Sequence, residues 1–326
     1  MIDQYGRKID YLRISITDRC NLRCVYCMPE TGISLTPHEA IMSFDEITRI
    51  CEIAADMGFT KIKITGGEPL VRKNAVALVR AIKGIERIEK VTLTTNGVLL
   101  GDVLEELVEC QIDGINVSLD ANQRAVYEQI TLIDAFDKVK ENILKILEYP
   151  AINLKINCVA FDGNRQNLIE MAKLARDYNV HVRFIEMMPI GYGKNYQRLE
   201  EATIVEFLSQ VYGEMKVYDK ELGNGPSHYY QIEGFKGKIG FISALSHRFC
   251  ETCNRVRLTS QGFLKTCLQY ETGVDLRALL RNGADDQTIK EVMTKAISEK
   301  PSGHAFLTGD FTNDQENELS MDKIGG

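Results

Sequence analysis

The sequence lacks several features that define common classes of protein. It has no apolar run approaching the about 18 residues of a membrane-spanning helix, and its first residues, MIDQYGRKID, do not form a signal peptide. It also lacks a basic excess, because 39 Lys and Arg stand against 46 Asp and Glu, for a net charge of -7. We therefore expect a cytoplasmic protein that binds neither membranes nor nucleic acid.

A phosphate-binding GxxxxGK[ST] loop is absent as well, so any nucleotide would be held by separate side chains. The 326 residues include 44% hydrophobic and 26% charged residues, which is ordinary for a globular protein. This length suits one large domain, or one domain with a sizeable appendage, and allows a substantial buried core.

The nine cysteines are the first positive signal. In a reducing compartment they indicate metal or redox chemistry more than disulfides. Cys51, Cys110 and Cys158 stand singly in apolar segments, where a free cysteine is usually a small buried hydrophobic residue. The other six form two triplets.

The first triplet, Cys20, Cys24 and Cys27, has the spacing Cys-x3-Cys-x2-Cys. A cubane cluster has four irons, so three thiolates leave one iron open to a small molecule. The alternative is a zinc site completed by a distant residue such as His38. The odd number of cysteines favours a reactive iron-sulfur cluster.

The second triplet is Cys250, Cys253 and Cys267. Its spacing alone leaves two interpretations open, a second open cluster or a Cys3His zinc site completed by His247. Arg255 and Arg257 follow at alternate positions, so in an extended segment their guanidinium groups share one face and could grip a phosphate.

Short β-branched runs alternate with amphipathic stretches from residue 9 to about 190, which predicts six βα units around a parallel sheet. Six units favour a partial (β/α)6 TIM-type barrel with an open side, and a doubly wound sheet is the alternative. We expect strands at 11–17, 61–65, 90–95, 114–119, 153–161 and 180–187. We expect helices at 44–57, 72–84, 102–111, 135–148 and 166–178.

Beyond this region the alternation of strand and helix patterns gives way to short strands and turns, and we place a domain boundary near residue 212. Residues 1–212 form the barrel, and residues 213–326 form a C-terminal α+β domain that carries the second triplet. Turn-rich segments there separate short strands at 215–219, 228–232 and 238–242. Helices are expected at 201–211, 274–281 and 284–298.

Polar motifs follow the predicted strands at their C-terminal ends, where barrel enzymes carry their active sites. They are Gly66 to Pro69, Thr94 to Gly97, Ser118 to Asp120, and Glu186 to Met188. The first triplet with Tyr26, followed one strand later by Gly66-Gly67-Glu68, resembles the signature of the radical S-adenosylmethionine (SAM) enzymes.

Within that superfamily the chain resembles the GTP 3′,8-cyclase family of molybdenum cofactor biosynthesis nearly end to end. The matching segments are LRISITDRCNLRCVYCMP, ITGGEPL, LTTNG, GINVSLD, LKIN, RFIEMM, GFISALSHRFCETCNRVRLTSQGFLKTCL and the terminal Gly325-Gly326. The resemblance implies two 4Fe-4S clusters: Cys20, Cys24 and Cys27 hold the cluster that cleaves SAM, and the second triplet holds one that helps bind guanine.

The implied reaction starts with a 5′-deoxyadenosyl radical that takes hydrogen from the ribose 3′ carbon of GTP. The resulting radical attacks carbon 8 of guanine and yields (8S)-3′,8-cyclo-7,8-dihydroguanosine 5′-triphosphate. The resemblance further implies an electron donor and a downstream cyclic pyranopterin monophosphate synthase as partners, and a homodimer is possible.

The resemblance also assigns residues by position. The implied SAM contacts are Tyr26, Gly67, Ser118 and Met188. The implied GTP contacts are Arg13, Lys63, Thr94, Lys155, Arg255, Val256 and Arg257. The implied catalytic groups are Arg255, Arg257, Gly325 and Gly326, with the glycine tail supporting radical initiation on GTP.

Two positions depart from the family pattern: Lys63 replaces a typical arginine and Leu132 a typical glycine. Lysine cannot reproduce the bidentate arginine fork, so triphosphate affinity or substrate identity could differ. Two other functions compete with the cyclase: a radical SAM peptide-modifying maturase with an auxiliary cluster, and a cluster-containing sensor without turnover.

Overall fold

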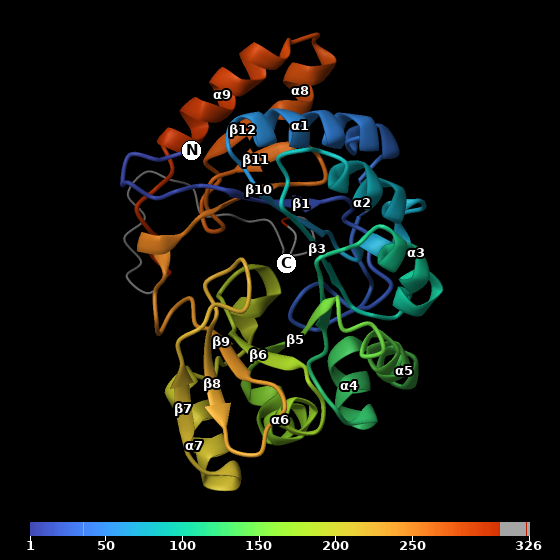
Figure 1. Cartoon of the computed structure of the whole chain (residues 1–326), viewed down its shortest axis with the longest axis vertical. Coiled ribbons are helices and arrows are strands. Elements are labelled where there is room, and N and C mark those ends of the chain that lie inside the picture. The colour runs from blue at the N-terminus through green and yellow to red at the C-terminus, as the bar shows by residue number, and fades with distance from the viewer. Residues whose placement is uncertain (35, 307–323, 325–326) are drawn as a thin grey trace.

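The computed structural model describes residues 1–34, 36–306 and 324. Its strands form one sheet in the order β12-β11-β10-β1-β2-β3-β4-β5-β6-β9-β8-β7, which curves around a central space (Figure 1). The first six strands are β1 (Tyr11–Ser15), β2 (Lys61–Thr65), β3 (Lys90–Thr95), β4 (Gly114–Ser118), β5 (Asn153–Ala160) and β6 (His181–Glu186). The others are β7 (Met215–Tyr218), β8 (His228–Ile232), β9 (Ile239–Ile242), β10 (Arg255–Leu258), β11 (Phe263–Lys265) and β12 (Gly273–Asp275).

Helices follow the strands and lie on the outside of the curved sheet (Figure 1). They are α1 (Phe44–Asp56), α2 (Ala75–Lys83), α3 (Leu104–Glu109), α4 (Arg124–Thr131), α5 (Phe136–Ile146), α6 (Leu168–Asp177), α7 (Glu201–Tyr212), α8 (Leu276–Arg281) and α9 (Asp286–Ser298). Helix α1 begins with a capping box, in which the Ser43 hydroxyl accepts from the Glu46 amide (3.1 Å) and the Glu46 carboxylate accepts from the Ser43 amide (2.7 Å). Helix α4 was not among the expected helices.

Strands β1 to β6 run parallel in sequence order, which confirms the predicted partial (β/α)6 barrel with its C-terminal α+β extension. The extension adds strands to both edges of this sheet. Strand β9 pairs parallel with β6, and β10 pairs parallel with β1. The sheet is therefore continuous across residue 212, and a domain boundary there stays a prediction.

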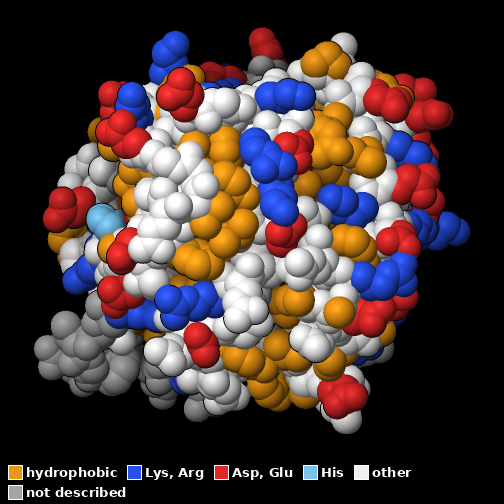
Figure 2. Space-filling view, turned by 90° about the horizontal axis from the view of Figure 1, so that it is seen from below, with side chains coloured by type: hydrophobic (Ala, Val, Ile, Leu, Met, Phe, Trp, Pro, Cys, Tyr) orange, Lys and Arg blue, Asp and Glu red, His pale blue; other side chains and the backbone are white. Residues whose placement is uncertain are grey.

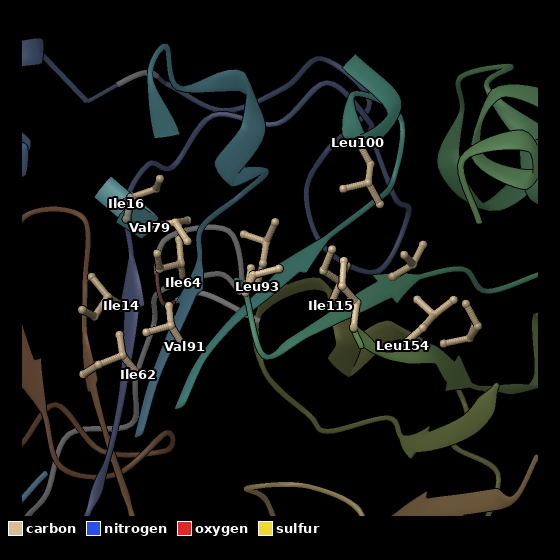
Figure 3. Packing of buried hydrophobic residues seen from close by; sticks show 14 of the residues in the cluster. Ile14, Ile16, Ile62, Ile64, Val79, Val91, Leu93, Leu100, Ile115 and Leu154 are labelled. Atoms are coloured by element: carbon tan, nitrogen blue, oxygen red, sulfur yellow. The ribbon is translucent and has the colours of Figure 1, made fainter. Parts of the chain in front are cut away.

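The two faces of the sheet differ in polarity. Apolar side chains such as Ile62, Val91 and Ile115 point outward and pack beneath the helices, as Figure 3 shows for several neighbouring strands. Polar side chains such as Lys63 and Thr92 take the alternate positions and point to the inside. The buried core is thus the layer between the sheet and the helices, and the polar strand positions face the interior of the barrel.

The surface is mixed in character. On the face shown in Figure 2, Lys and Arg side chains are interspersed with Asp and Glu side chains and with hydrophobic patches. Among the described residues, no helix combines the length and the apolar composition needed to cross a membrane.

Candidate functional site

The interior of the barrel contains a cavity of about 770 Å³. Every predicted site residue in the described part of the chain lines this cavity, with the exception of Val256. The Val256 side chain lies on the other face of β10 and is buried in the hydrophobic core, so only its backbone could face a ligand. The lining residues are Cys20, Cys24, Cys27, Tyr26, Gly67, Ser118, Met188, Arg13, Lys63, Thr94, Lys155, Arg255, Arg257, Cys250, Cys253 and Cys267.

The first triplet lies in the loop after β1, at the C-terminal end of the barrel strands. The Leu22 amide and the Asn96 side-chain amide donate to Cys20 Sγ at 3.4 and 3.8 Å. Burial raises the pKa of Cys20, and burial together with the Asp120 carboxylate raises the pKa of Cys24 well above its ordinary value. Without a metal, these thiols are therefore protonated at neutral pH.

Glu68 ties two of the predicted loops together. Its fully buried carboxylate accepts hydrogen bonds from the Thr95 hydroxyl (2.7 Å), the Asn96 amide (2.6 Å) and the Leu70 amide (3.0 Å). Burial raises the pKa of Glu68 to about 7, although these hydrogen bonds oppose the shift. Glu68 thus fixes the Gly66-Gly67 loop against the loop after β3.

Tyr26 and Asp120 link the first triplet to the sheet. The Tyr26 hydroxyl donates to Asp120 Oδ2 at 2.5 Å, and Asp120 Oδ1 accepts from the Val159 amide at 2.8 Å. Burial raises the pKa of Asp120 to about 6, against the effect of both hydrogen bonds. Asp120 was part of a predicted motif, but its contact with Tyr26 depends on the fold.

Cationic side chains occupy the middle of the cavity. The register of the strands aligns Arg257 on β10 with Arg13 on β1, and Arg13 with Lys63 on β2. Burial lowers the pKa of all three, and each has neighbouring cations that lower it further. Like charges held together in a buried site indicate an anionic ligand.

Lys155 and Arg183 extend this charged set on β5 and β6. Lys155 Nζ donates to Asn153 Oδ1 at 2.7 Å, and the Arg183 guanidinium donates twice to Asn157 Oδ1, at 2.9 and 2.6 Å. Burial, followed by the charges of Arg183 and Lys90, lowers the pKa of Lys155 to about 7. Arg183 was not predicted, although a charged residue in the apolar run VHVRFIEM is the same signal that singled out Lys155.

The second triplet lies at the opposite end of the barrel. Tyr11 pairs with Arg255, so Cys253 precedes the N-terminal ends of β10 and β1, whereas Cys20 follows the C-terminal end of β1. Burial would raise the pKa of Cys250, but hydrogen bonding with His304 and the charge of Arg248 outweigh it and lower the pKa to about 7.

His247 points away from this triplet. Its Nδ1 lies 3.4 Å from the buried Glu201 carboxylate, and its side chain is 60% exposed. His304 lines the cavity instead. Among the described residues, no group of three or more His, Cys, Asp or Glu side chains is arranged to hold a single metal ion. The zinc alternative with His247 therefore finds no support in this geometry.

Two further predictions concern the C-terminal glycines and Leu132, which differs from the family pattern. Gly325 and Gly326 lie outside the described residues, so their predicted role is untested, while the preceding Ile324 is 1% exposed. Leu132 caps α4 in the left-handed conformation at φ 55°, which favours glycine. The Thr131 carbonyl accepts from the Arg23 amide at 2.9 Å, so this turn abuts the first triplet loop.

Two solved structures of one protein have a similar fold. The Streptococcus suis SuiB structure bound to precursor peptide SuiA aligns with a TM-score of 0.62 and 14% identity over 91% of this chain and 66% of that chain. SuiB bound to S-adenosylmethionine aligns with a TM-score of 0.58 and 16% identity over 80% and 60%. At this identity the similarity concerns the fold alone.

Family models and curated relatives identify the family more specifically than the solved structures do. The model of the radical SAM superfamily matches residues 14–164, and the Molybdenum Cofactor Synthesis C model matches residues 180–306. A GTP 3′,8-cyclase of Clostridium perfringens is 44% identical, and one of Syntrophomonas wolfei is 43% identical, each over all of both chains. The chain therefore belongs to the GTP 3′,8-cyclase family of the radical SAM superfamily.

Proposed function

We propose that this protein converts GTP to (8S)-3′,8-cyclo-7,8-dihydroguanosine 5′-triphosphate, the first step of molybdenum cofactor biosynthesis. The observation that carries the proposal is the single cavity with a cysteine triplet at each end and buried cations between them. A nucleotide triphosphate held by these cations would lie within reach of both ends.

Cys20, Cys24 and Cys27 would hold the first 4Fe-4S cluster. These three thiols line the cavity, and N–H groups already point at Cys20 Sγ, which is how proteins stabilise cluster-bound thiolates. When bound and reduced, this cluster supplies the electron that cleaves SAM to the 5′-deoxyadenosyl radical.

Tyr26, Gly67, Ser118 and Met188 would hold SAM beside that cluster. Gly67 allows its loop to pack directly on the loop that carries the first triplet, because a Cβ atom there would lie 2.5 Å from the Arg19 carbonyl oxygen and 2.7 Å from that of Asp18. The Asp120 carboxylate, fixed by Tyr26, would stabilise the positive charge of the sulfonium.

Arg13, Lys63, Thr94 and Lys155 would hold the triphosphate. The buried cations lower one another's pKa, and an anion between them would remove that penalty. Lys63 contacts the Thr94 hydroxyl at 3.5 Å, so the two would act together. These residues would orient the ribose toward the SAM end and exclude water from it.

Cys250, Cys253 and Cys267 would hold the second cluster, whose open iron would contact guanine. Burial would raise the pKa of Cys253, but the charges of Arg255 and Lys300 and a hydrogen bond with the Arg255 backbone together outweigh it and lower this pKa, which favours the thiolate that metal binding requires. Arg255 and Arg257 would be the catalytic cations at this end, and the Gly325-Gly326 tail would support radical initiation.

The remaining parts of the proposal concern partners and location. An electron donor supplies one electron for the cleavage of SAM and a second electron that, with a proton, converts the cyclised nucleotide radical to the dihydro product. A cyclic pyranopterin monophosphate synthase would then consume this product. We place the protein in the cytoplasm, and a homodimer is the assembly to test. A peptide-modifying function is not favoured, because the relatives that match at full length and 43–44% identity are called GTP 3′,8-cyclases.

Anaerobic reconstitution with iron and sulfide, followed by incubation with SAM, dithionite and GTP, tests the proposal. We expect 5′-deoxyadenosine and the cyclic nucleotide in equal amounts, and about eight irons per chain. Formation of 5′-deoxyadenosine without consumption of GTP would reject the cyclase function. About four irons with one zinc would reject a second cluster.

A further inference from the structure

A glycine-containing segment lines one end of the cavity. Glu221 to Ser227, in the connection between β7 and β8, lines the cavity along its whole length, and we call it the strap. It crosses from one edge of the sheet toward the other, because the Asn224 carbonyl accepts a hydrogen bond from Asn254 Nδ2 at 3.3 Å. Asn254 directly precedes β10 and also donates to Asp10 Oδ1 at 3.0 Å. The strap therefore covers the N-terminal ends of the strands.

The strap brings bare backbone against two cations from opposite sides of the barrel. A Cβ atom on Gly223 would lie 3.6 Å from Lys155 Nζ, and one on Gly225 would lie 3.7 Å from Arg255 Nη1. Both distances are ordinary van der Waals contacts, so each glycine lies beside one of these cations with room for about one methyl group between them. Lys155 and Arg255 are thus held beside the same short stretch of chain.

Hydrogen-bond donors in the strap are available to a ligand. Among the described residues, the amides of Gly223, Asn224 and Gly225 donate to no other group. The Ser227 hydroxyl is out of contact with solvent, has no hydrogen-bond partner in the described part of the chain, and belongs to a cavity-lining residue. Successive backbone amides beside cations bind phosphate in proteins. Glu221 also lines the cavity, and its carboxylate opposes an anion.

We propose that the strap recognises the terminal phosphate of the nucleotide, with the backbone amides of Gly223 to Gly225, the Ser227 hydroxyl, Lys155 and Arg255 as donors. This inference rests on the proposed function, which supplies a triphosphate as the ligand. It makes the strap the part of the protein that distinguishes a triphosphate from a diphosphate. The pKa of Lys155, lowered by burial to about 7, agrees with a site that gains its full charge when an anion binds.

The test measures dissociation constants of GTP, GDP and GMP by anaerobic calorimetry on the reconstituted protein. We expect the wild-type protein to bind GTP about tenfold more tightly than GDP. Gly223→Pro removes one amide donor and should reduce this preference to roughly threefold or less. Ser227→Ala should reduce it by about twofold to threefold, with GMP and SAM binding unchanged in both variants.

Two variants serve as matched controls. Gly223→Ala keeps the amide and adds a Cβ in ordinary contact with Lys155, so it should retain the wild-type preference. Ser209→Ala, on helix α7 and away from the cavity lining, should retain it as well. Circular dichroism establishes that each variant is folded, and Ser227→Ala carries the test if Gly223→Pro is not.

The outcomes separate this inference from the proposed function. A wild-type protein that prefers GTP, with the same preference in Gly223→Pro and Ser227→Ala, overturns the role of the strap and leaves the cyclase function intact. A wild-type protein that binds GTP no more tightly than GDP overturns it too. A protein that binds no guanine nucleotide contradicts both.

Discussion

The two ends of the cavity carry the same number of thiols in opposite electrostatic surroundings. At the first end, burial and a neighbouring carboxylate raise the pKa of Cys24 well above its ordinary value. At the second end, His304 and Arg248 together outweigh burial and lower the pKa of Cys250 to about 7. The pKa of Cys253 is also lowered, because Arg255 and Lys300 together outweigh burial. The ends therefore suit ligands of opposite charge.

Carboxylates gather where the proposed ligand is a sulfonium cation, and cations gather where it is a polyphosphate. Asp120 and Glu68 are buried at the first end. Arg13, Arg255 and Arg257 lie between the middle of the cavity and the second end. On the proposed function, the two ends of one cavity would attract the sulfonium and the triphosphate through opposite charges.

The largest expected effect comes from replacing one cysteine at each end of the cavity. Cys24→Ala should abolish 5′-deoxyadenosine formation, because the radical source loses a ligand, whereas Cys253→Ala should retain SAM cleavage that is not coupled to GTP. Each variant should lose about four irons. Liquid chromatography of the nucleosides, with iron analysis, measures both. Equal behaviour of the two variants would contradict distinct roles for the two ends.

The next largest effect is expected from removing the two C-terminal glycines. Removal of Gly325 and Gly326 should suppress cyclisation by about a hundredfold or more while GTP and SAM affinities stay within about twofold, because positioned groups act on the reaction rather than on binding. Calorimetry and product analysis measure the two separately. Full activity of the truncated protein would reject this role.

Lys155 should make GTP binding depend on pH. With a pKa lowered to about 7 in the empty site, the ammonium is lost as the pH rises, while a bound triphosphate requires it charged. Affinity for GTP should fall roughly tenfold between about pH 7 and pH 8.5 in the wild-type protein. Lys155→Arg stays charged and should show little change over this range. An equal dependence of GTP affinity on pH in both proteins would contradict this role of Lys155.

The smallest expected effect comes from a substitution at Tyr26, which tests the proposed SAM site. Tyr26→Phe removes the hydrogen bond to the buried Asp120 carboxylate and leaves that oxygen without its donor. The free energy of unfolding should fall by about 1–3 kcal/mol. Affinity for SAM should weaken by roughly threefold to tenfold, with GTP affinity unchanged. Urea titration and calorimetry give the two values. A loss of GTP affinity instead would indicate that Tyr26 serves the other end.

The sequence predicted those parts of the fold that are specified locally. Strands β2 and β3 begin and end at the expected residues, because their β-branched alternation is complete within the strand. Helix α4 was missed, since an eight-residue helix depends on packing of residues such as Tyr127 and Ile130 rather than on its own propensity. Strands β10 to β12 are three or four residues long and exist through pairing with β1 and with one another.

The features that the sequence did not predict depend on contacts between distant parts of the chain. Spacing singled out His247 as the neighbour of the second triplet, but the fold turns it toward Glu201 and brings His304 to Cys250. The strap gave only a turn signal in the sequence. Its position beside Lys155 and Arg255 depends on the pairing of β9 with β6 and of β10 with β1, which no local pattern encodes.

Transfer of deuterium tests most directly whether one cavity holds the radical source and the substrate together. The reconstituted protein is incubated with SAM, dithionite and GTP deuterated at the ribose 3′ carbon, and the 5′-deoxyadenosine is analysed by mass spectrometry. We expect one deuterium in the 5′-deoxyadenosine formed during product formation. Unlabelled 5′-deoxyadenosine alongside consumed GTP would contradict the account.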